Sequence, residues 1–129
     1  MMTTSELANR FVAMCREGKN FDVMKEMYDE KIVSVEAVQR ATGSFETPGK
    51  AAVIQKSADW AGAHEIHGGS VDGPYLLGDR FAVVFAFEVT PKATGQRVTV
   101  REVGVYTVNN GLITREEFYY GDGSSALAR

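Results

Sequence analysis

The sequence predicts an α+β fold: three N-terminal helices packed on the concave face of a curved antiparallel sheet, with a cone-shaped space between them. Two observations predict it. Apolar residues recur at helical spacing in three segments before residue 63, and β-branched and aromatic residues fill long strand-like segments after it. A chain of 129 residues can form one hydrophobic core but not two, so residues 1–129 form a single domain.

The first two helices have clear boundaries. Thr3 and Glu6 have the spacing of a capping box, and Gly18 is placed to end the first helix. Asn20 can cap the second helix. The apolar stripes of the two helices contain Leu7, Phe11, Met14, Phe21, Met24, Met27 and Tyr28.

A strand follows the second helix and ends at Glu36, and residues 37–46 are predicted to form a loop. Thr47–Pro48 has the pattern of a helix start, and the third helix is expected to end near Gly62. Its apolar face is expected to consist of Ala51, Ile54, Ala58 and Ala61, with Trp60 beside them.

The rest of the chain predicts a four-strand antiparallel meander. Its strands are expected within residues 64–72, with a turn at Gly73–Pro74 and a short segment Tyr75–Leu77, and then over residues 80–90, 97–108 and 112–120. The Asn109–Asn110–Gly111 segment should form the last hairpin turn, because Asn and Gly tolerate positive φ angles. Residues 122–129 are expected to form a flexible tail.

Composition excludes several classes of protein. The net charge of −3 and the absence of any Lys/Arg-rich run argue against nucleic-acid binding. No apolar run approaches the roughly 18 residues of a membrane span, and no signal peptide is expected. The single cysteine, Cys15, favours a reducing, cytoplasmic location.

Strand alternation predicts which side chains face the helices. The expected inner sets are Phe81, Val83, Phe85, Phe87 and Val89, and Val98, Val100, Glu102, Gly104, Tyr106 and Val108. On the last strand, Glu116, Phe118 and Tyr120 share one face, and Arg115, Glu117 and Tyr119 share the other. The opposite phase would place Arg97 and Arg101 inside, which is unfavourable for their charges.

Three segments resemble the nuclear transport factor 2-like superfamily, and within it the SnoaL-like and ketosteroid-isomerase-like group: FDVMKEMYDEKIVSVEA, TPGKAAVIQ and GVYTVNNGLITREEFYYG. The resemblance covers nearly the whole chain and implies a cystatin-like cone. This superfamily contains isomerases, cyclases and dehydratases as well as binding modules, so the fold alone does not identify the activity.

The resemblance also implies candidate site residues. It implies that Glu116, Phe118 and Tyr120 of the last strand point inward. It places Glu36 at the position of the isomerases' general base. Their oxyanion donors, a tyrosine on the first helix and a protonated acid on a late strand, correspond here to Phe11 and roughly to Gly104. Neither residue can donate, so the isomerase donor pair is missing.

The first hypothesis for function is an acid/base isomerase, cyclase or dehydratase that acts on a carbonyl-containing apolar substrate without a cofactor. Glu36 would be the base, with Glu102, Glu116 and Tyr106 as further catalytic candidates. Candidate ligand contacts are His67, Phe85, Phe87, Phe118, Tyr120 and Trp60. The alternatives are a non-catalytic pocket for a small apolar ligand and a dimeric interaction module.

The two histidines and the cysteine suggest a metal site and a nucleophile, but neither is expected here. His64 and His67 would point to opposite faces of a strand, so they cannot share a metal ion, and no metal site is expected. Cys15 lies on a helical apolar stripe and is expected to be a buried small side chain rather than a nucleophile.

The outer face of the predicted sheet favours a homodimer. Ala82, Val84, Ala86, Val103 and Val105 would form a flat apolar surface there. Soluble monomers rarely expose such a surface, and pairing with a second copy about a two-fold axis would cover it.

Overall fold

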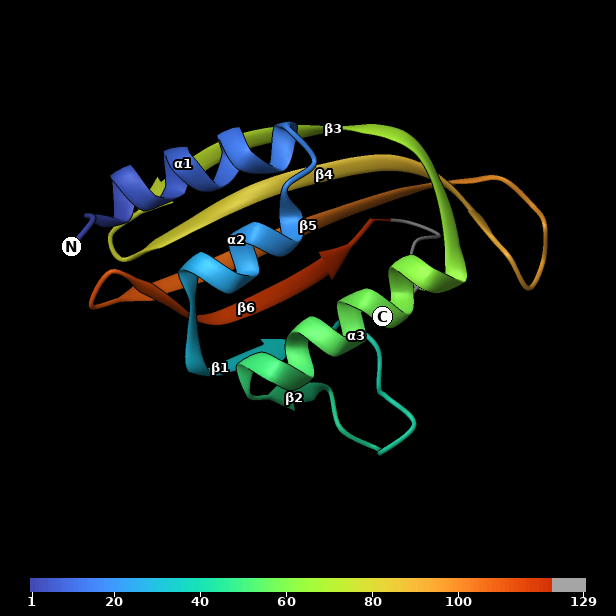
Figure 1. Ribbon diagram of the computed structural model, residues 1–129, viewed down its shortest axis with the longest axis horizontal. Coiled ribbons are helices and arrows are strands. Elements are labelled where there is room, and N and C mark those ends of the chain that lie inside the picture. Colours follow the sequence, from blue (N-terminus) through green and yellow to red (C-terminus); the bar gives the residue numbers. More distant parts are fainter. Residues whose placement is uncertain (122–129) are drawn as a thin grey trace.

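The computed structural model describes residues 1–121, and the expected tail at 122–129 lies outside the described residues. It has three helices and one six-stranded sheet (Figure 1). The helices are α1 (Thr4–Arg16), α2 (Asn20–Met27) and α3 (Lys50–Ala63). The strands are β1 (Tyr28–Val35), β2 (Glu46–Pro48), β3 (His64–Leu77), β4 (Arg80–Pro91), β5 (Val98–Asn109) and β6 (Leu112–Tyr120).

The sheet has the order β2-β1-β6-β5-β4-β3. The four long strands β3 to β6 form the predicted antiparallel meander, and the turn at Asn109–Gly111 joins its last two strands. Of the other two strands, the sequence predicted β1, as the strand that ends at Glu36, but it did not predict β2. β1 pairs in parallel with β6, and β2 lies antiparallel to β1 at the edge.

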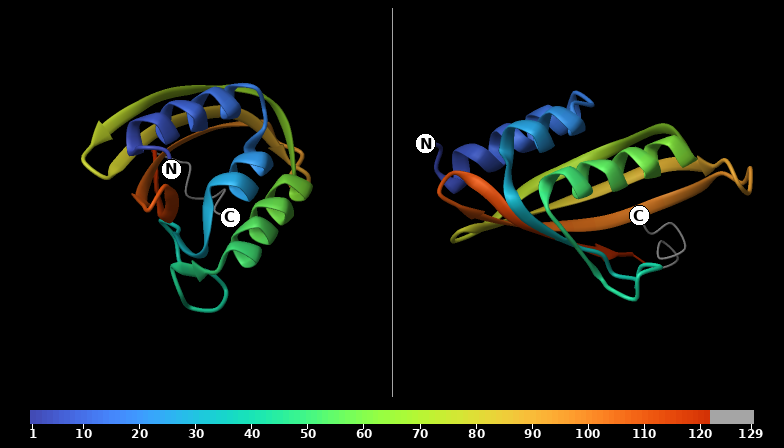
Figure 2. Two further views of the ribbon diagram at one scale, coloured as in Figure 1. Left: turned by 60° about the vertical axis from the view of Figure 1, so that its left-hand side comes forward. Right: turned by 60° about the horizontal axis from the view of Figure 1, so that its bottom comes forward.

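The helices lie on the concave side of the sheet, as predicted. The end-on view in Figure 2 shows the sheet curling around, with α2 and α3 closing its open side. α1 packs along β3 and β4, and its Leu7 and Phe11 are buried in the main core. The capping box predicted at Thr3 and Glu6 is present, so the first helix begins where the sequence predicted.

Burial confirms the predicted phase of the three C-terminal strands. On β5, Val100, Glu102, Gly104, Tyr106 and Val108 are buried, and the residues between them are exposed or half-buried. Phe81, Val83 and Phe85 on β4 and Glu116 and Phe118 on β6 are also buried. The long strands therefore present alternate side chains to the helices.

The prediction for the third helix was wrong in two respects. Thr47 does not cap it: Thr47 pairs with Ser34 in β2, and the helix begins one residue after Gly49, whose φ of 95° suits glycine. The buried face is Val53, Lys56 and Trp60, whereas Ala51 and Ala58 are exposed. Alanine residues occur on both sides of the helix, and alanine is tolerated in buried and in exposed positions. Their spacing therefore did not identify the buried face.

The predicted break at Gly73–Pro74 was also wrong. β3 continues through this dipeptide, whose peptide bond is cis, and residues on both sides of it pair with β4. The pairing register shifts between Asp72 and Tyr75, so the dipeptide is accommodated as an irregularity within the strand rather than as a turn.

Among the residues that the structure describes, none of the helices has the length and apolar character needed to cross a membrane.

Candidate functional site

A cavity of about 350 Å³ lies between the three helices and the concave face of the sheet. Its volume is in the range typical of small-molecule sites. Most of its wall is apolar or aromatic, including Phe11, Phe21, Met24, Trp60, Val71, Phe85, Phe87 and Phe118. The space therefore suits an organic molecule with a substantial apolar surface.

Two acidic side chains belong to the cavity wall. Glu102 on β5 and Glu116 on β6 both line it, and each residue is only 2% exposed. The described lining contains no Lys, Arg or His. A wall with carboxyl groups and no cation favours neutral ligands over anionic ones.

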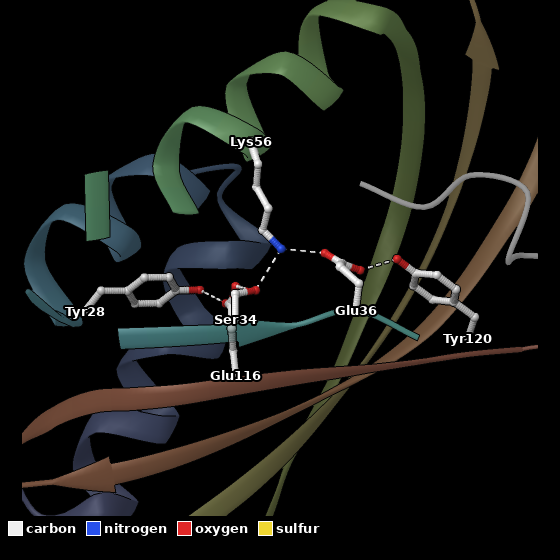
Figure 3. Close-up of polar contacts among 6 residues, drawn as sticks. All are labelled: Tyr28, Ser34, Glu36, Lys56, Glu116 and Tyr120. Atoms are coloured by element: carbon white, nitrogen blue, oxygen red, sulfur yellow. Dashed lines mark hydrogen bonds and ion pairs between the residues drawn. The ribbon is translucent and has the colours of Figure 1, made fainter. Parts of the chain in front are cut away.

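A buried polar network lies beside the cavity and connects three parts of the fold (Figure 3). Lys56 on α3 donates to Glu36 Oε1 at 2.5 Å and to Ser34 Oγ at 2.7 Å. Ser34 in turn donates to Glu116 Oε2 at 2.6 Å. One lysine thus interacts directly with one carboxyl group and, through a hydroxyl group, with a second.

Each of these two carboxyl groups also accepts a hydrogen bond from a tyrosine. Tyr28 at the start of β1 donates to Glu116 Oε1, and Tyr120 at the end of β6 donates to Glu36 Oε2. Both oxygens of Glu36 and both oxygens of Glu116 therefore have donors. Such contacts satisfy buried carboxylates and fix their orientation.

The pKa of the Tyr28 hydroxyl is raised well above its usual value of 10, first by burial and then by the nearby Glu116 carboxylate. Tyr28 therefore stays protonated throughout the range in which proteins work. It acts as a permanent hydrogen-bond donor to Glu116.

Strand pairing brings the members of the network together. Ser34 on β1 lies opposite Glu116 on β6 in the parallel pair, and Tyr106 on β5 lies opposite Glu116 on its other side. Because β6 is flanked by β1 and β5, these three side chains meet on the concave face of the sheet.

Tyr106 occupies the space left by the missing side chain at Gly104. A Cβ atom built on Gly104 would come within 2.6 Å of the Tyr106 hydroxyl oxygen and within 2.9 Å of its ring. Glycine at position 104 is therefore what allows the Tyr106 ring to fold back over its own strand. The family resemblance had placed a proton-donating acid of the isomerases near this position, and here a phenol group lies in that space.

The structure brings most of the predicted ligand contacts to the cavity. Phe85, Phe87, Phe118 and Trp60 all line it, together with Tyr106, Glu102 and Glu116. Glu36 and Tyr120 are not among the lining residues and instead belong to the adjacent network. The role of Glu36 as a base stays a prediction, while the acids that form the wall are Glu102 and Glu116.

The prediction that His67 lines the pocket was wrong. His67 is exposed, and its Nε2 atom lies 2.7 Å from Thr90 Oγ1. Ile66 pairs with Val89 and Gly68 with Glu88, so His67 is the extra residue of a β-bulge. A bulge interrupts the alternation of side chains on which the prediction relied.

The other histidine packs against the helix instead. His64 stacks on Trp60 with 4.2 Å between ring centroids, and its Nδ1 lies 2.7 Å from the Trp60 carbonyl oxygen. Within residues 1–121, no group of three or more His, Cys, Asp or Glu side chains is placed to hold a metal ion.

Sequence reasoning did not predict three members of the network, Tyr28, Ser34 and Lys56, and the least expected of them is Lys56. It is 7% exposed, although lysine is rarely buried unless it is paired. One signal was available: Val53, Lys56 and Trp60 follow the three- and four-residue spacing of a helical stripe. Its partners, Ser34 on β1 and Glu36 directly after β1, lie 22 and 20 residues earlier in the chain, and helical spacing alone cannot identify them.

Comparison with known proteins identifies the family. A model of the SnoaL-like domain matches residues 2–120. A crystal structure from Mesorhizobium loti, described as a "putative SnoaL-like polyketide cyclase", is 49% identical with a TM-score of 0.88, over 92% of this chain and 100% of that one. The comparison with curated proteins found no match.

More distant structures share the fold. A "putative isomerase" from Bacillus subtilis has a TM-score of 0.71 at 20% identity, over 93% of this chain and 90% of that one. A protein from Catenulispora acidiphila with a ketosteroid isomerase-like fold has a TM-score of 0.69 at 17% identity, over 95% of this chain and 91% of that one. The chain belongs to the SnoaL-like family and has the ketosteroid-isomerase-like, nuclear transport factor 2-like fold.

Proposed function

We propose that this protein is a cofactor-independent acid/base enzyme of the isomerase or cyclase kind, acting on a neutral, largely apolar carbonyl compound in the cavity. The observation that carries the proposal is Glu116, a buried carboxyl group that lines an aromatic cavity and is held by two defined donors. The description of the Mesorhizobium loti protein as a "putative SnoaL-like polyketide cyclase" agrees with this class of reaction.

The proposed reaction begins with proton removal. Glu116 accepts a proton from the carbon next to the substrate carbonyl, and the electron pair of the C–H bond moves into the new C=C bond while the carbonyl oxygen becomes an enolate. Each Glu116 oxygen accepts one hydrogen bond in the network, which leaves a second lone pair for this task. The proton then returns to carbon, or the enolate carbon attacks a second carbonyl group in a cyclisation.

The developing negative charge needs a donor in the cavity. Tyr106 lines the cavity, lies opposite Glu116 in the sheet and fills the space above Gly104. A phenol hydroxyl at this place can donate to an enolate oxygen, and such contacts are strengthened where water is excluded. Glu102, on the same strand face as Tyr106, is a second acid that can exchange protons with the substrate.

Exchange of the α-hydrogens of 2-tetralone in D₂O, followed by NMR, tests the proposal. This ketone is neutral, bicyclic and acidified at the carbons next to its carbonyl group. The wild-type protein should accelerate exchange, Glu116→Gln should reduce the accelerated rate by about 10²- to 10⁴-fold, and Tyr106→Phe should reduce it by roughly tenfold or more.

Glu65→Gln is the matched control, because Glu65 is an exposed glutamate on β3 outside the cavity lining. It should exchange 2-tetralone at the wild-type rate. A wild-type exchange rate in Glu116→Gln would show that Glu116 is not the base. Tight binding of 2-tetralone by the wild-type protein without any exchange would point instead to the non-catalytic binding module.

A further inference from the structure

We propose that Lys56 is the positioning residue of this site: acting through the Ser34 hydroxyl, it orients the Glu116 carboxylate and keeps it in the ionised, proton-accepting form. The proposal rests on the proposed function for its catalytic consequence. Its structural basis is the chain of contacts Lys56–Ser34–Glu116, which joins α3, β1 and β6 (Figure 3).

The direction of the Ser34 hydrogen bond follows from Lys56. A serine hydroxyl has one hydrogen, and an ammonium group can only donate. Because Ser34 Oγ accepts from Lys56 Nζ at 2.7 Å, its own hydrogen is directed to Glu116 Oε2 at 2.6 Å. Without the ammonium group, the Ser34 hydroxyl could rotate to other acceptors and Glu116 would lose one of its two fixed donors.

The charge of Lys56 acts on both carboxyl groups. Its ammonium group contacts Glu36 directly at 2.5 Å and reaches Glu116 across a single hydroxyl group. It also lies over the Phe118 ring, 5.6 Å from the centroid, where the π face favours a cation. A positive charge among buried carboxyl groups favours their ionised form, which is the form that can accept a proton.

Structural stability alone gives a weak reason for a lysine at this position. Val53 and Trp60, its neighbours on the buried stripe of α3, are apolar. Replacing a buried ion pair by well-packed apolar side chains is often neutral or stabilising. The arrangement around Lys56 is therefore better explained by its effect on the two carboxyl groups than by its contribution to the core.

Other titratable groups surround Glu116 and contribute to its pH response. Those on the elements packed around it are Tyr28 on β1, Glu36 directly after β1, Tyr106 and Glu102 on β5, Tyr120 on β6, Lys56 on α3 and Cys15 on α1. Among these described groups Lys56 is the one cation, so removing it leaves only acidic and neutral groups around Glu116.

The test follows the ionisation of Glu116 directly. In protein labelled with ¹³C at glutamate carboxyl carbons, the Glu116 resonance is identified by its loss in Glu116→Gln and is titrated in the wild type and in Lys56→Met. Methionine keeps an unbranched side chain and removes the charge. The Glu116 titration should move to higher pH by at least one unit in Lys56→Met, and the acid limb of the 2-tetralone exchange profile should move with it.

Lys50→Met is the control. Lys50 is at the start of the same helix and donates to the Lys25 carbonyl oxygen, away from the network. It should leave both profiles unchanged. A folded Lys56→Met protein whose Glu116 resonance titrates within 0.3 pH units of the wild type would overturn the proposal.

Ser34 variants keep the proposal testable if Lys56→Met does not fold. Ser34→Ala retains Lys56 but breaks the connection, and it should lower the exchange rate about tenfold; Ser34→Thr, which restores the hydroxyl, should recover most of that loss. A wild-type rate in Ser34→Ala would overturn the role of the hydroxyl. If the wild type exchanges no ketone but the Glu116 resonance still responds to Lys56→Met, the proposed function fails while the role of Lys56 stands.

Discussion

At the residue scale, the site depends on polar side chains that are buried and fully paired. Ser34 is completely buried, and Glu36 and Glu116 are each 2% exposed. In such surroundings a lost partner leaves a donor or acceptor without compensation, which costs more than the hydrogen bond itself contributes. For each substitution within the network, the melting temperature should therefore be measured together with the activity.

Cys15 is a buried titratable residue outside the network. It lies on α1 at the cavity wall, and burial raises the pKa of its thiol from 9.0 to about 12. The folded protein therefore keeps the thiol protonated at pH values where the unfolded chain ionises. The native thiol should be unreactive toward iodoacetamide at pH 8, because the thiolate is the nucleophile.

The same shift predicts a loss of stability in alkali. The thiol pKa is higher in the folded state, so the stability linked to this group is complete below pH 9 and falls as the pH rises toward 12. Between pH 8 and pH 10 the free energy of unfolding of the wild type should fall by roughly 1 kcal/mol more than that of Cys15→Ala. Urea unfolding of both proteins at the two pH values measures this difference; equal losses would contradict it.

At the element scale, β3 is shaped by glycines where it follows the cavity. A Cβ atom on Gly69 would lie 2.4 Å from the Ala86 carbonyl oxygen and 2.5 Å from Phe87 Cβ. Both atoms belong to the paired strand β4, so neither can move away cheaply. Glycine at this position permits the close approach of β3 and β4 next to the bulge at His67.

Gly69→Ala should therefore destabilise the fold by about 1–3 kcal/mol, the usual cost of forcing extra volume into a packed site. Gly62→Ala is the matched comparison, because Gly62 lies inside α3 with nothing within 4 Å of its added Cβ. That substitution should stabilise the protein by about 0.5–1 kcal/mol. Chemical denaturation of the two variants measures both effects, and equal stabilities would show that the crowding at Gly69 is relieved by strand movement.

At the scale of the whole molecule, we propose that the chain forms a homodimer through the outer face of the sheet. Ala82, Val84, Ala86, Val103 and Val105 are half-buried on this face, and Tyr119, which pairs with Val103, is 57% exposed. These side chains are uncharged, and Asp72, Arg101 and Glu117 lie beside them on the paired strands. Such a surface suits association of two copies about a two-fold axis.

Light scattering at tens of micromolar protein should give the mass of a dimer for the wild type. Val103→Glu should give the mass of a monomer, because it places a charge at the centre of the apolar face. Lys92→Glu, at an exposed position after β4, should leave the mass unchanged. A monomeric wild type, together with an unchanged mass for Val103→Glu, would mean that this face is simply solvated.

The sequence predicted the architecture because its signals were local. Alternating Phe and Val on β4, the Asn–Gly turn before β6 and the capping box of α1 each depend on residues close together in the chain. The phase of β5 followed from the preference of Arg97 and Arg101 for solvent, which directs Glu102 and Tyr106 inward. The phase of β6, and with it the inward direction of Glu116, followed from the family resemblance.

The parts that escaped prediction depend on contacts between distant residues. Lys56 is buried because it pairs with Ser34 on β1 and with Glu36 directly after β1, and β2 forms because Glu46, Thr47 and Pro48 pair with β1. His67 turned outward because one extra residue shifts the pairing of β3 with β4. Helical and strand periodicity contain no information about such pairings.

The most direct test of the central claim is a crystal structure of the protein with 2-tetralone. The account predicts the ketone inside the cavity, with its α-carbon about 3–3.5 Å from a Glu116 oxygen and its carbonyl oxygen within hydrogen-bond distance of the Tyr106 hydroxyl. A ketone bound with its carbonyl group directed away from Tyr106 and its α-carbon out of reach of Glu116, or bound only outside the cavity, would contradict the account.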